Sequence, residues 1–334
     1  RVAVDEYGRM YCVSDSQYNG LMVFEKDNTF SGFIGANKTS VSASDIIWQF
    51  LSTKAQKERQ SIFIPTEFSS VAIDKDNFIY TTTSTVDMYS PESSEPVRRQ
   101  SPGGDNIIRF SNDNYPIGDT DYLYVNDVLA GPSRFCDIAI WDNMMYSVLD
   151  QTRNRIFTYD GNGSLLFVCG GYGENEGFFS RPRAIEQRND RLYVLDSKTG
   201  AITVFAPTEY TQNLIMATDY TAEGDYNSAL SAWNKVLEYN GNNELAYLNV
   251  ARILLNKGEY SGALEYAKKA NNQQVYSEAF SQLRSNFVSR NIGMIIISVI
   301  ALCAVCYLVS RLNKRFQFSE KLKAVSATYS SLLN

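Results

Sequence analysis

Apolar and polar residues alternate in short runs through the first 206 residues, and the same arrangement recurs in four places. Each copy has an alternating run, a polar turn, a second run centred on a tyrosine, another turn and a third run. Period-two alternation with β-branched and aromatic residues is typical of strands, and Asp, Asn and Gly mark the turns. The second runs are centred on Tyr11, Tyr80, Tyr146 and Tyr193, and the copies are Val2–Phe24, Val71–Ser84 completed by Asn106–Phe110, Ile138–Tyr159 and Ala184–Phe205.

A fixed spacing supports the repeat. Asp15, Asp150 and Asp196 each stand nine residues before the aromatic residue that ends the copy, which is Phe24, Tyr159 or Phe205. Repeats of about 45 residues with three or four strands are typical of β-propellers. We therefore predict an all-β propeller over residues 1–207. Asp at a turn binds backbone amides, so we expect a structural role for these three carboxylates.

The shared pattern, A-[VI]-D-x-x-x-x-[IM]-Y-x-x-x-D-x-x-x-x-x-[IM]-x-x-[FY], resembles the NHL-repeat family of propellers. The first and third copies match it well, whereas the second has Ser84 and the fourth has Gln187 in place of an Asp. Members of this family commonly close with six blades. The resemblance therefore implies that the four visible blades are incomplete and that one or two blades precede Arg1.

Two inserts interrupt the repeats. Residues 44–59 have apolar positions at helical spacing after Ser44, which predicts a short helix. Residues 86–105 are rich in Ser, Pro and Glu, which predicts a loop.

A second repeat, of 34 residues, follows in residues 208–289. Gly224-Asp225-Tyr226 recurs as Gly258-Glu259-Tyr260, and Ala229-Leu230 recurs as Ala263-Leu264. This spacing, with Gly at the turn and Ala where two helices approach, resembles the tetratricopeptide repeat. The resemblance covers Thr208 to about Ala270 and implies a concave groove for a protein segment. Tyr220, Trp233 and Tyr247 are candidates to line that groove, and packing between the helices is the alternative role of each.

Residues 291–310 form a third kind of segment, with twenty apolar or uncharged side chains between Arg290 and Arg311. A helix of about 20 residues spans the hydrocarbon core of a bilayer, so we predict a transmembrane helix. Five Lys and Arg residues follow within residues 311–334, but only Arg284 and Arg290 precede it closely. Because basic loops stay in the cytoplasm, we expect an extracytoplasmic N-terminal part and a cytoplasmic C-terminus at the cell membrane. We also expect both ends of the chain to be truncated.

Composition restricts the chemistry. The net charge of −6 argues against nucleic-acid binding, and the absence of histidine excludes a histidine base or histidine-ligated zinc. Cys303-x-x-Cys306 lies inside the apolar segment, where packing is the simpler role. Lactonase-like propellers hold calcium with Asp, Asn and Glu side chains from several blades, and this sequence has Asp5, Asp74 and Asp137 as candidates for such a site.

The order of the parts resembles bacterial membrane proteins that join NHL propellers, tetratricopeptide repeats and a C-terminal membrane domain, often beside sugar uptake systems. The resemblance implies a membrane-anchored recognition scaffold without enzymatic activity or a required cofactor. Its expected partners are proteins, with a transporter component or a surface glycan as candidates. The alternative function is a calcium-dependent, lactonase-like hydrolase. A third hypothesis is an assembly factor in which the hairpins are the working part.

Overall fold

The computed structural model divides the chain into two compact units, residues 1–245 and residues 246–334. The predicted helix at residues 44–59, together with Asp15 and Ser84, lies outside the residues that the structure describes. The described residues are 1–14, 19–35, 67–83, 95–101, 103–110, 115–125 and 128–332.

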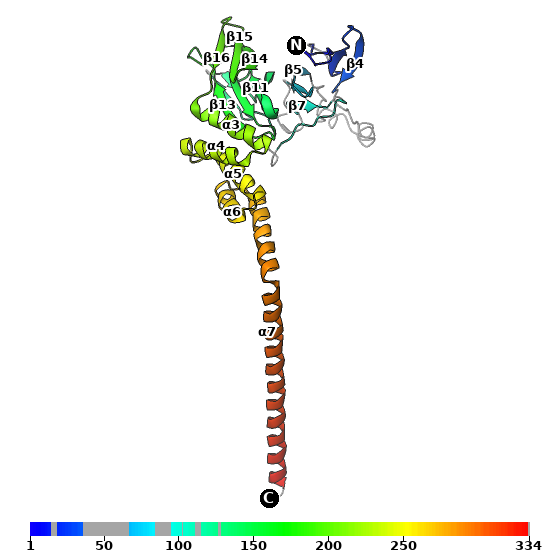
Figure 1. Cartoon of the computed structure of the whole chain (residues 1–334), viewed down its shortest axis with the longest axis vertical. Helices are drawn as coiled ribbons and strands as arrows, with labels where there is room; N and C mark the ends of the chain where they lie inside the picture. Colours follow the sequence, from blue (N-terminus) through cyan, green and yellow to red (C-terminus); the bar gives the residue numbers. More distant parts are fainter. Residues whose placement is uncertain are drawn as a thin grey trace, which may run out of the picture. The chain divides into compact units, whose positions relative to one another are not determined.

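Four antiparallel sheets follow one another along the first unit, each an up-and-down meander in chain order (Figure 1). The first sheet contains β1 (Val2–Val4), β2 (Met10–Cys12), β3 (Leu21–Phe24) and β4 (Phe30–Ile34). The second contains β5 (Phe68–Ile73), β6 (Ile79–Thr83) and β7 (Val97–Gln100). The third contains β10 (Phe135–Ile140), β11 (Tyr146–Asp150), β12 (Arg155–Tyr159) and β13 (Leu165–Gly170). The fourth contains β14 (Pro182–Arg188), β15 (Arg191–Asp196) and β16 (Ile202–Phe205).

Most of the predicted strands are confirmed, but the third strand of the second sheet is not where the sequence placed it. That strand is β7, whereas the predicted run Asn106–Phe110 contributes only a single bridge from Asn106 to Gln100. The prediction of a loop over residues 86–105 is therefore wrong for Val97–Gln100. A small separate sheet pairs β8 (Leu123–Val125) with β9 (Val128–Ala130).

The two arginines of β7 explain the error, because adjacent positive charges are unusual in a buried strand. Arg99 is 9% exposed, yet its guanidinium lies 3.2 Å from the Asp74 carboxylate and 3.9 Å from the centroid of the Phe78 ring. Arg98 pairs with Glu95 at 3.0 Å. The ion pair with Asp74 and the stacking on Phe78 offset the cost of burying the Arg99 guanidinium. Sequence spacing could not identify either of these two partners.

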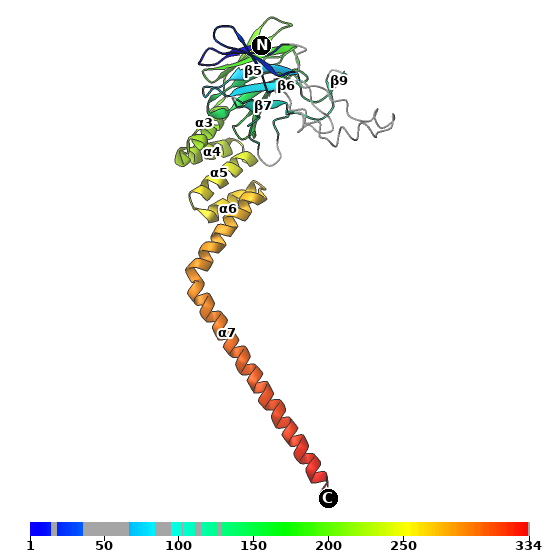
Figure 2. The ribbon, with the colours of Figure 1, turned by 90° about the vertical axis from the view of Figure 1, so that its right-hand side faces the viewer.

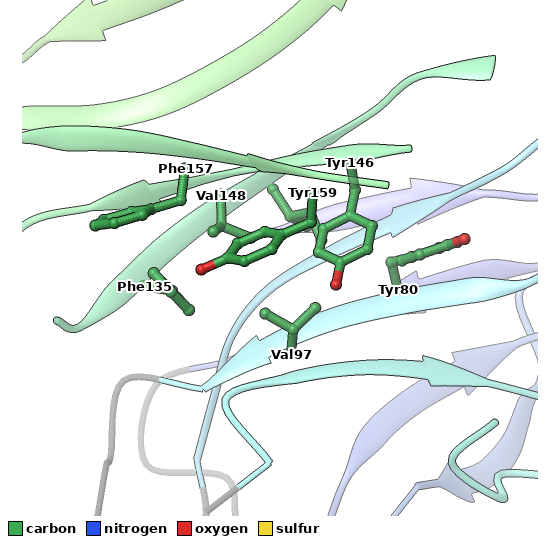
Figure 3. Close-up of a cluster of buried hydrophobic side chains, with 8 residues drawn as sticks. Tyr80, Val97, Phe135, Tyr146, Val148, Phe157 and Tyr159 are labelled. Atoms are coloured by element: carbon green, nitrogen blue, oxygen red, sulfur yellow. The ribbon is translucent and has the colours of Figure 1, made fainter. Parts of the chain in front are cut away.

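The sheets pack face to face through apolar cores. The first sheet meets the second through Tyr11, Leu21, Val23, Phe68, Val71 and Ile79. The second meets the third through Tyr80, Val97, Phe135, Ile138, Tyr146, Val148, Phe157 and Tyr159, most of which Figure 3 labels. The first strands also neighbour each other, since β5 lies beside both β1 and β10, and β10 lies beside β14.

Tyr146 does not occupy the position that Tyr11 and Tyr80 occupy in their sheets, so the predicted equivalence is wrong for this residue. The turn before each second strand is closed by a backbone bond, from Asp5 to Arg9, from Asp74 to Phe78 and from Trp141 to Met145. Tyr11 and Tyr80 come two residues after that closing carbonyl, whereas Tyr146 comes one residue after it. A shift of one residue turns a side chain to the opposite face of a sheet. The rings of Tyr80 and Tyr146 therefore meet between two sheets, with centroids 5.9 Å apart (Figure 3).

The row of sheets is open in the part of the chain that the structure describes. On the first sheet, Val2 and Val4 are 62% and 56% exposed on the face turned away from the second sheet. On the fourth sheet, Ile202 is 63% exposed on the face turned away from the third. Each end of the row thus presents an apolar face, and the sheets do not close into a ring.

Two helices complete the first unit, α3 (Glu209–Glu223) and α4 (Tyr226–Tyr239). Thr208 caps the start of α3, and Asp225 caps the start of α4 by accepting from the Ser228 amide. Gly224 joins them with a φ of 79°, a left-handed conformation that glycine adopts without strain. Ala229 is fully buried where the helices pack.

The second unit repeats this arrangement with α5 (Glu244–Asn256), which begins two residues before the boundary, and α6 (Tyr260–Lys269). Gly258 has a φ of 78° and Ala263 is fully buried, as Gly224 and Ala229 are one repeat earlier. The predicted 34-residue periodicity is thus confirmed in both the turns and the packing.

The last helix, α7 (Gln273–Leu332), is 60 residues long and continues well beyond α6 (Figure 2). It includes the uncharged segment at residues 291–310, for which the sequence predicted a helix. Within the described residues it is the one helix long and apolar enough to cross a membrane, and no part of its apolar stretch is buried. Ile297 is 68% exposed and Leu302 65% exposed, which is the environment expected of side chains that face lipid.

Candidate functional site

The first helical hairpin has a polar link inside an apolar interface. Trp233 on α4 is 1% exposed, and its indole Nε1 donates to Thr221 Oγ1 on α3 at 3.0 Å. The same hydroxyl donates to the Ala217 carbonyl at 2.6 Å. Trp233 therefore packs between the helices of its hairpin and contributes little surface to a ligand.

Tyr220 and Tyr247, the other two groove candidates, are half-buried. Tyr247 on α5 lies in a small aromatic and cationic cluster, with its ring centroid 6.0 Å from that of Tyr266 and 5.8 Å from Lys269 Nζ. Tyr220 and Trp233 belong to the first unit and Tyr247 to the second. A groove that contains all three therefore stays a prediction.

Helix α3 also contacts the β-rich part through a pair that the sequence did not indicate. Asn143, in the short helical turn η2 (Asp142–Met144), donates from Nδ2 to the Asp219 carboxylate at 2.9 Å. Burial raises the pKa of Asp219, although the bond from Asn143 opposes the rise. This contact gives the hairpin a defined attachment to the third sheet.

Two of the recurring aspartates, Asp150 and Asp196, accept hydrogen bonds from backbone amides. Asp150 accepts from the amides of Arg134 and Thr152 and from Ser133 Oγ, at 2.8 to 2.9 Å. Asp196 accepts from the amides of Ser180, Arg181, Lys198 and Thr199, at 2.6 to 3.3 Å. In both sheets the carboxylate at the end of the second strand thus ties the next turn to the residues before the first strand. The predicted structural role is confirmed at these two positions.

Their pKa values shift in opposite directions. At Asp150 burial is the dominant cause and raises the pKa despite the hydrogen bonds. At Asp196 burial acts in the same direction, but four backbone amides outweigh it and the pKa lies below 3.8. A lowered pKa adds stability that is present above the unfolded-state value and is lost as the pH falls through the folded-state value.

Asp196→Asn should therefore lower the unfolding free energy by about 1–3 kcal/mol at pH 7, because a charge-assisted acceptor is lost. The difference from wild type should shrink as the pH falls below the unfolded-state pKa of an aspartate, about 4, and through the lowered pKa of folded Asp196. Thermal unfolding of the detergent-solubilised chain, followed by circular dichroism from pH 7 to 3, measures this. Asp150→Asn is the matched control, because its raised pKa predicts that wild type gains stability relative to this variant on acidification. A constant difference for Asp196→Asn would contradict the assignment.

The three carboxylates proposed for calcium are engaged separately. Asp5 accepts from the amides of Tyr7 and Arg9 and from Arg9 Nε, the last at 2.7 Å. Asp74 accepts from two amides of its own turn and pairs with Arg99. No group of three or more Cys, Asp or Glu side chains that could hold a metal ion occurs in the described ranges. Asp5, Asp74 and Asp137 thus each have separate partners in the part of the chain that the structure describes.

Asp137 instead joins neighbouring sheets. It lies on β10 at 6% exposure and accepts from Ser70 Oγ on β5 and from the Ile185 amide on β14, the latter at 2.9 Å. Arg1 lies 3.3 Å from the same carboxylate. Burial raises the pKa of Asp137, and these partners oppose the rise. The one sequence feature that marks this residue is an acidic side chain inside an otherwise apolar strand.

Comparison with known proteins identifies one part of the chain. A family model described as tetratricopeptide repeat matches residues 220–286, which confirms the predicted resemblance over that range. No curated protein matches the chain.

Several solved structures are distantly similar. A catalytically inactive virginiamycin B lyase from Staphylococcus aureus, with quinupristin, has a TM-score of 0.34 and 11% identity over 62% of this chain and 55% of its own. An auxiliary nutrient-binding protein from Bacteroides ovatus has a TM-score of 0.32 and 10% identity, over 62% and 42%. The extracellular domain of a hybrid two-component system from B. thetaiotaomicron has a TM-score of 0.29 and 10% identity, over 61% and 26%. The chain thus spans about half or less of each, and likenesses this low carry no argument about its function.

Proposed function

We propose that this protein is a membrane-anchored scaffold that binds other proteins through its helical hairpins. The observation that carries the proposal is the order of two features in residues 208–332. Two hairpins with a 34-residue period, matched in part by the tetratricopeptide family, are followed directly by a helix with an exposed, uncharged stretch. Such hairpins recognise protein segments, and such a stretch is stable in lipid.

The proposed orientation rests on charge. Arg311, Lys314 and Arg315 follow the apolar stretch within five residues, and Lys321 and Lys323 come soon after. Because Lys and Arg near a membrane span stay in the cytoplasm, the sheets and hairpins would lie outside it. In this arrangement, residues 1–207 would recognise a ligand and residues 208–289 would dock a protein. Residues 291–310 would cross the membrane, and residues 311–334 would lie in the cytoplasm.

The β-rich part is proposed to be an NHL-like propeller that recognises a partner of its own. Support comes from four successive meanders whose first strands are neighbours and from the equivalent roles of Asp150 and Asp196. The apolar faces at both ends of the row would pack against further blades. A surface glycan or a component of a sugar transporter is the partner class that the order of domains suggests.

Protein binding by the hairpins can be tested with Tyr220→Ala/Tyr247→Ala. Loss of two aromatic side chains should lower the affinity for a bound protein by about tenfold or more. Proteins crosslinked to the full chain in native membranes would be quantified by mass spectrometry for wild type and variant. Tyr124→Ala, which removes a 76% exposed tyrosine from β8, is the control and should retain the same proteins. Identical capture by all three chains would contradict a groove at these residues.

A further inference from the structure

Among the described strands, none pairs with the outer edge of β16, whereas the third strands of the first and third sheets each have a fourth strand beside them. In the first sheet β4 pairs with β3, and in the third sheet β13 pairs with β12, both antiparallel. In the fourth sheet β16 pairs with β15, and no described strand pairs with its other edge. The chain cannot supply one locally, because Thr208 already caps α3 three residues after β16 ends.

A hollow of about 630 Å³ is lined in part by β16. Thr203, Val204 and Phe205 of β16 form one side, and the loop from Gly173 to Phe178 forms the other. Unpaired backbone groups on an outer strand are a template for another strand. The hollow is thus lined by residues of the strand whose outer edge has no described partner.

The hollow is acidic. Glu174 and Glu176 line it and are exposed, and its lining includes no lysine or arginine. Asp196 also lines it, but its oxygens already accept from four backbone amides. Val204 on the strand and Phe178 on the loop are 46% and 42% exposed and add apolar contact surface.

We propose that β16 binds an extended segment of a partner protein as a fourth, antiparallel strand. The fourth strands of two other sheets indicate the length of such a segment, since β4 has five residues and β13 has six. The segment would alternate apolar residues, which cover Val204, with Lys or Arg residues, which face Glu174 and Glu176. Backbone hydrogen bonds give such a complex its affinity, and the side chains give it its specificity. This inference rests on the proposed role as a recognition scaffold, but it requires neither the membrane nor the hairpins.

The probe is a fluorescent, end-blocked hexapeptide of sequence Val-Lys-Val-Thr-Val-Lys, titrated into the detergent-solubilised full chain. Saturable binding is expected. Glu174→Lys/Glu176→Lys should weaken it about tenfold or more, since both charges reverse at an exposed loop. Glu223→Lys/Glu238→Lys, the same change near the ends of α3 and α4, is the control and should leave it unchanged. Hydrogen exchange at the amides of β16 should slow when the peptide binds.

Three results would overturn the proposal. The first is equal binding of a peptide with Glu in place of Lys, and the second is equal binding of a peptide with N-methylated backbone. The third is protection of the β16 amides before any peptide is added, which would mean that another part of the same protein or a second copy already covers the edge. Tyr220→Ala/Tyr247→Ala should bind the peptide normally, so failure of the hairpin proposal and failure of this one are distinguishable.

Discussion

Ile296→Asp/Ile300→Asp should release the protein from membranes. Both isoleucines lie in the middle of the uncharged stretch of α7 and are 52% and 62% exposed. An aspartate near the centre of a membrane-spanning helix costs about 2.5–3.5 kcal/mol, so the pair costs about 5–7 kcal/mol. That is enough to reverse the insertion of a single apolar segment. Alkaline carbonate extraction followed by flotation measures the fraction that remains in the membrane.

Leu312→Asp/Phe316→Asp is the matched control for that experiment. These side chains lie on the same helix, four residues apart and 64% and 66% exposed, but beyond the uncharged stretch. The same loss of apolar surface should leave the protein in the membrane, because the new charges lie near the interface. Release of both variants, or of neither, would contradict a span at residues 291–310.

Trp233→Ala should produce the largest loss of stability in the hairpins. The ring is 1% exposed, and truncating a buried tryptophan costs about 3–5 kcal/mol. The change also removes the indole donor to Thr221. We expect the helical circular dichroism signal of the solubilised chain to melt earlier and over a broader range.

Two variants serve as controls for the stability loss of Trp233→Ala. Trp233→Phe keeps most of the apolar volume and should cost clearly less than Trp233→Ala. Tyr220→Ala removes a half-buried ring and should affect binding more than melting. If Trp233→Ala melts like wild type, Trp233 is not a packing residue and its predicted place in a ligand groove regains support.

The sequence predicted best where local periodicity decides the structure. The strands that contain the four tyrosines, the glycine turns at Gly224 and Gly258, and the uncharged stretch in α7 all follow from spacing within a few residues. The roles of Asp150 and Asp196 were also predictable, because a carboxylate at a turn has nearby amides to accept from. The second sheet was harder, since β7 depends on Asp74 and Phe78, more than twenty residues away.

Long-range contacts also limited the prediction of sites. Asp5 and Asp74 each follow an alternating apolar run and bind the amides of their own turns, whereas Asp137 lies inside β10 and joins β5 to β14. Tyr146 resembles Tyr80 in a simple alignment, but a shift of one residue puts it on the opposite face. The lack of a described strand beside the outer edge of β16 could not be predicted, because strand pairing depends on the whole sheet and not on one strand's sequence.

We propose that α7 crosses the membrane, with the sheets and hairpins outside the cytoplasm. Protease added to intact cells that carry the natural protein with a C-terminal epitope tests this most directly. We expect a membrane-bound fragment that carries the epitope and begins near residue 290, formed without permeabilising the cells. An epitope that stays on the full-length protein until the membrane is opened would contradict it.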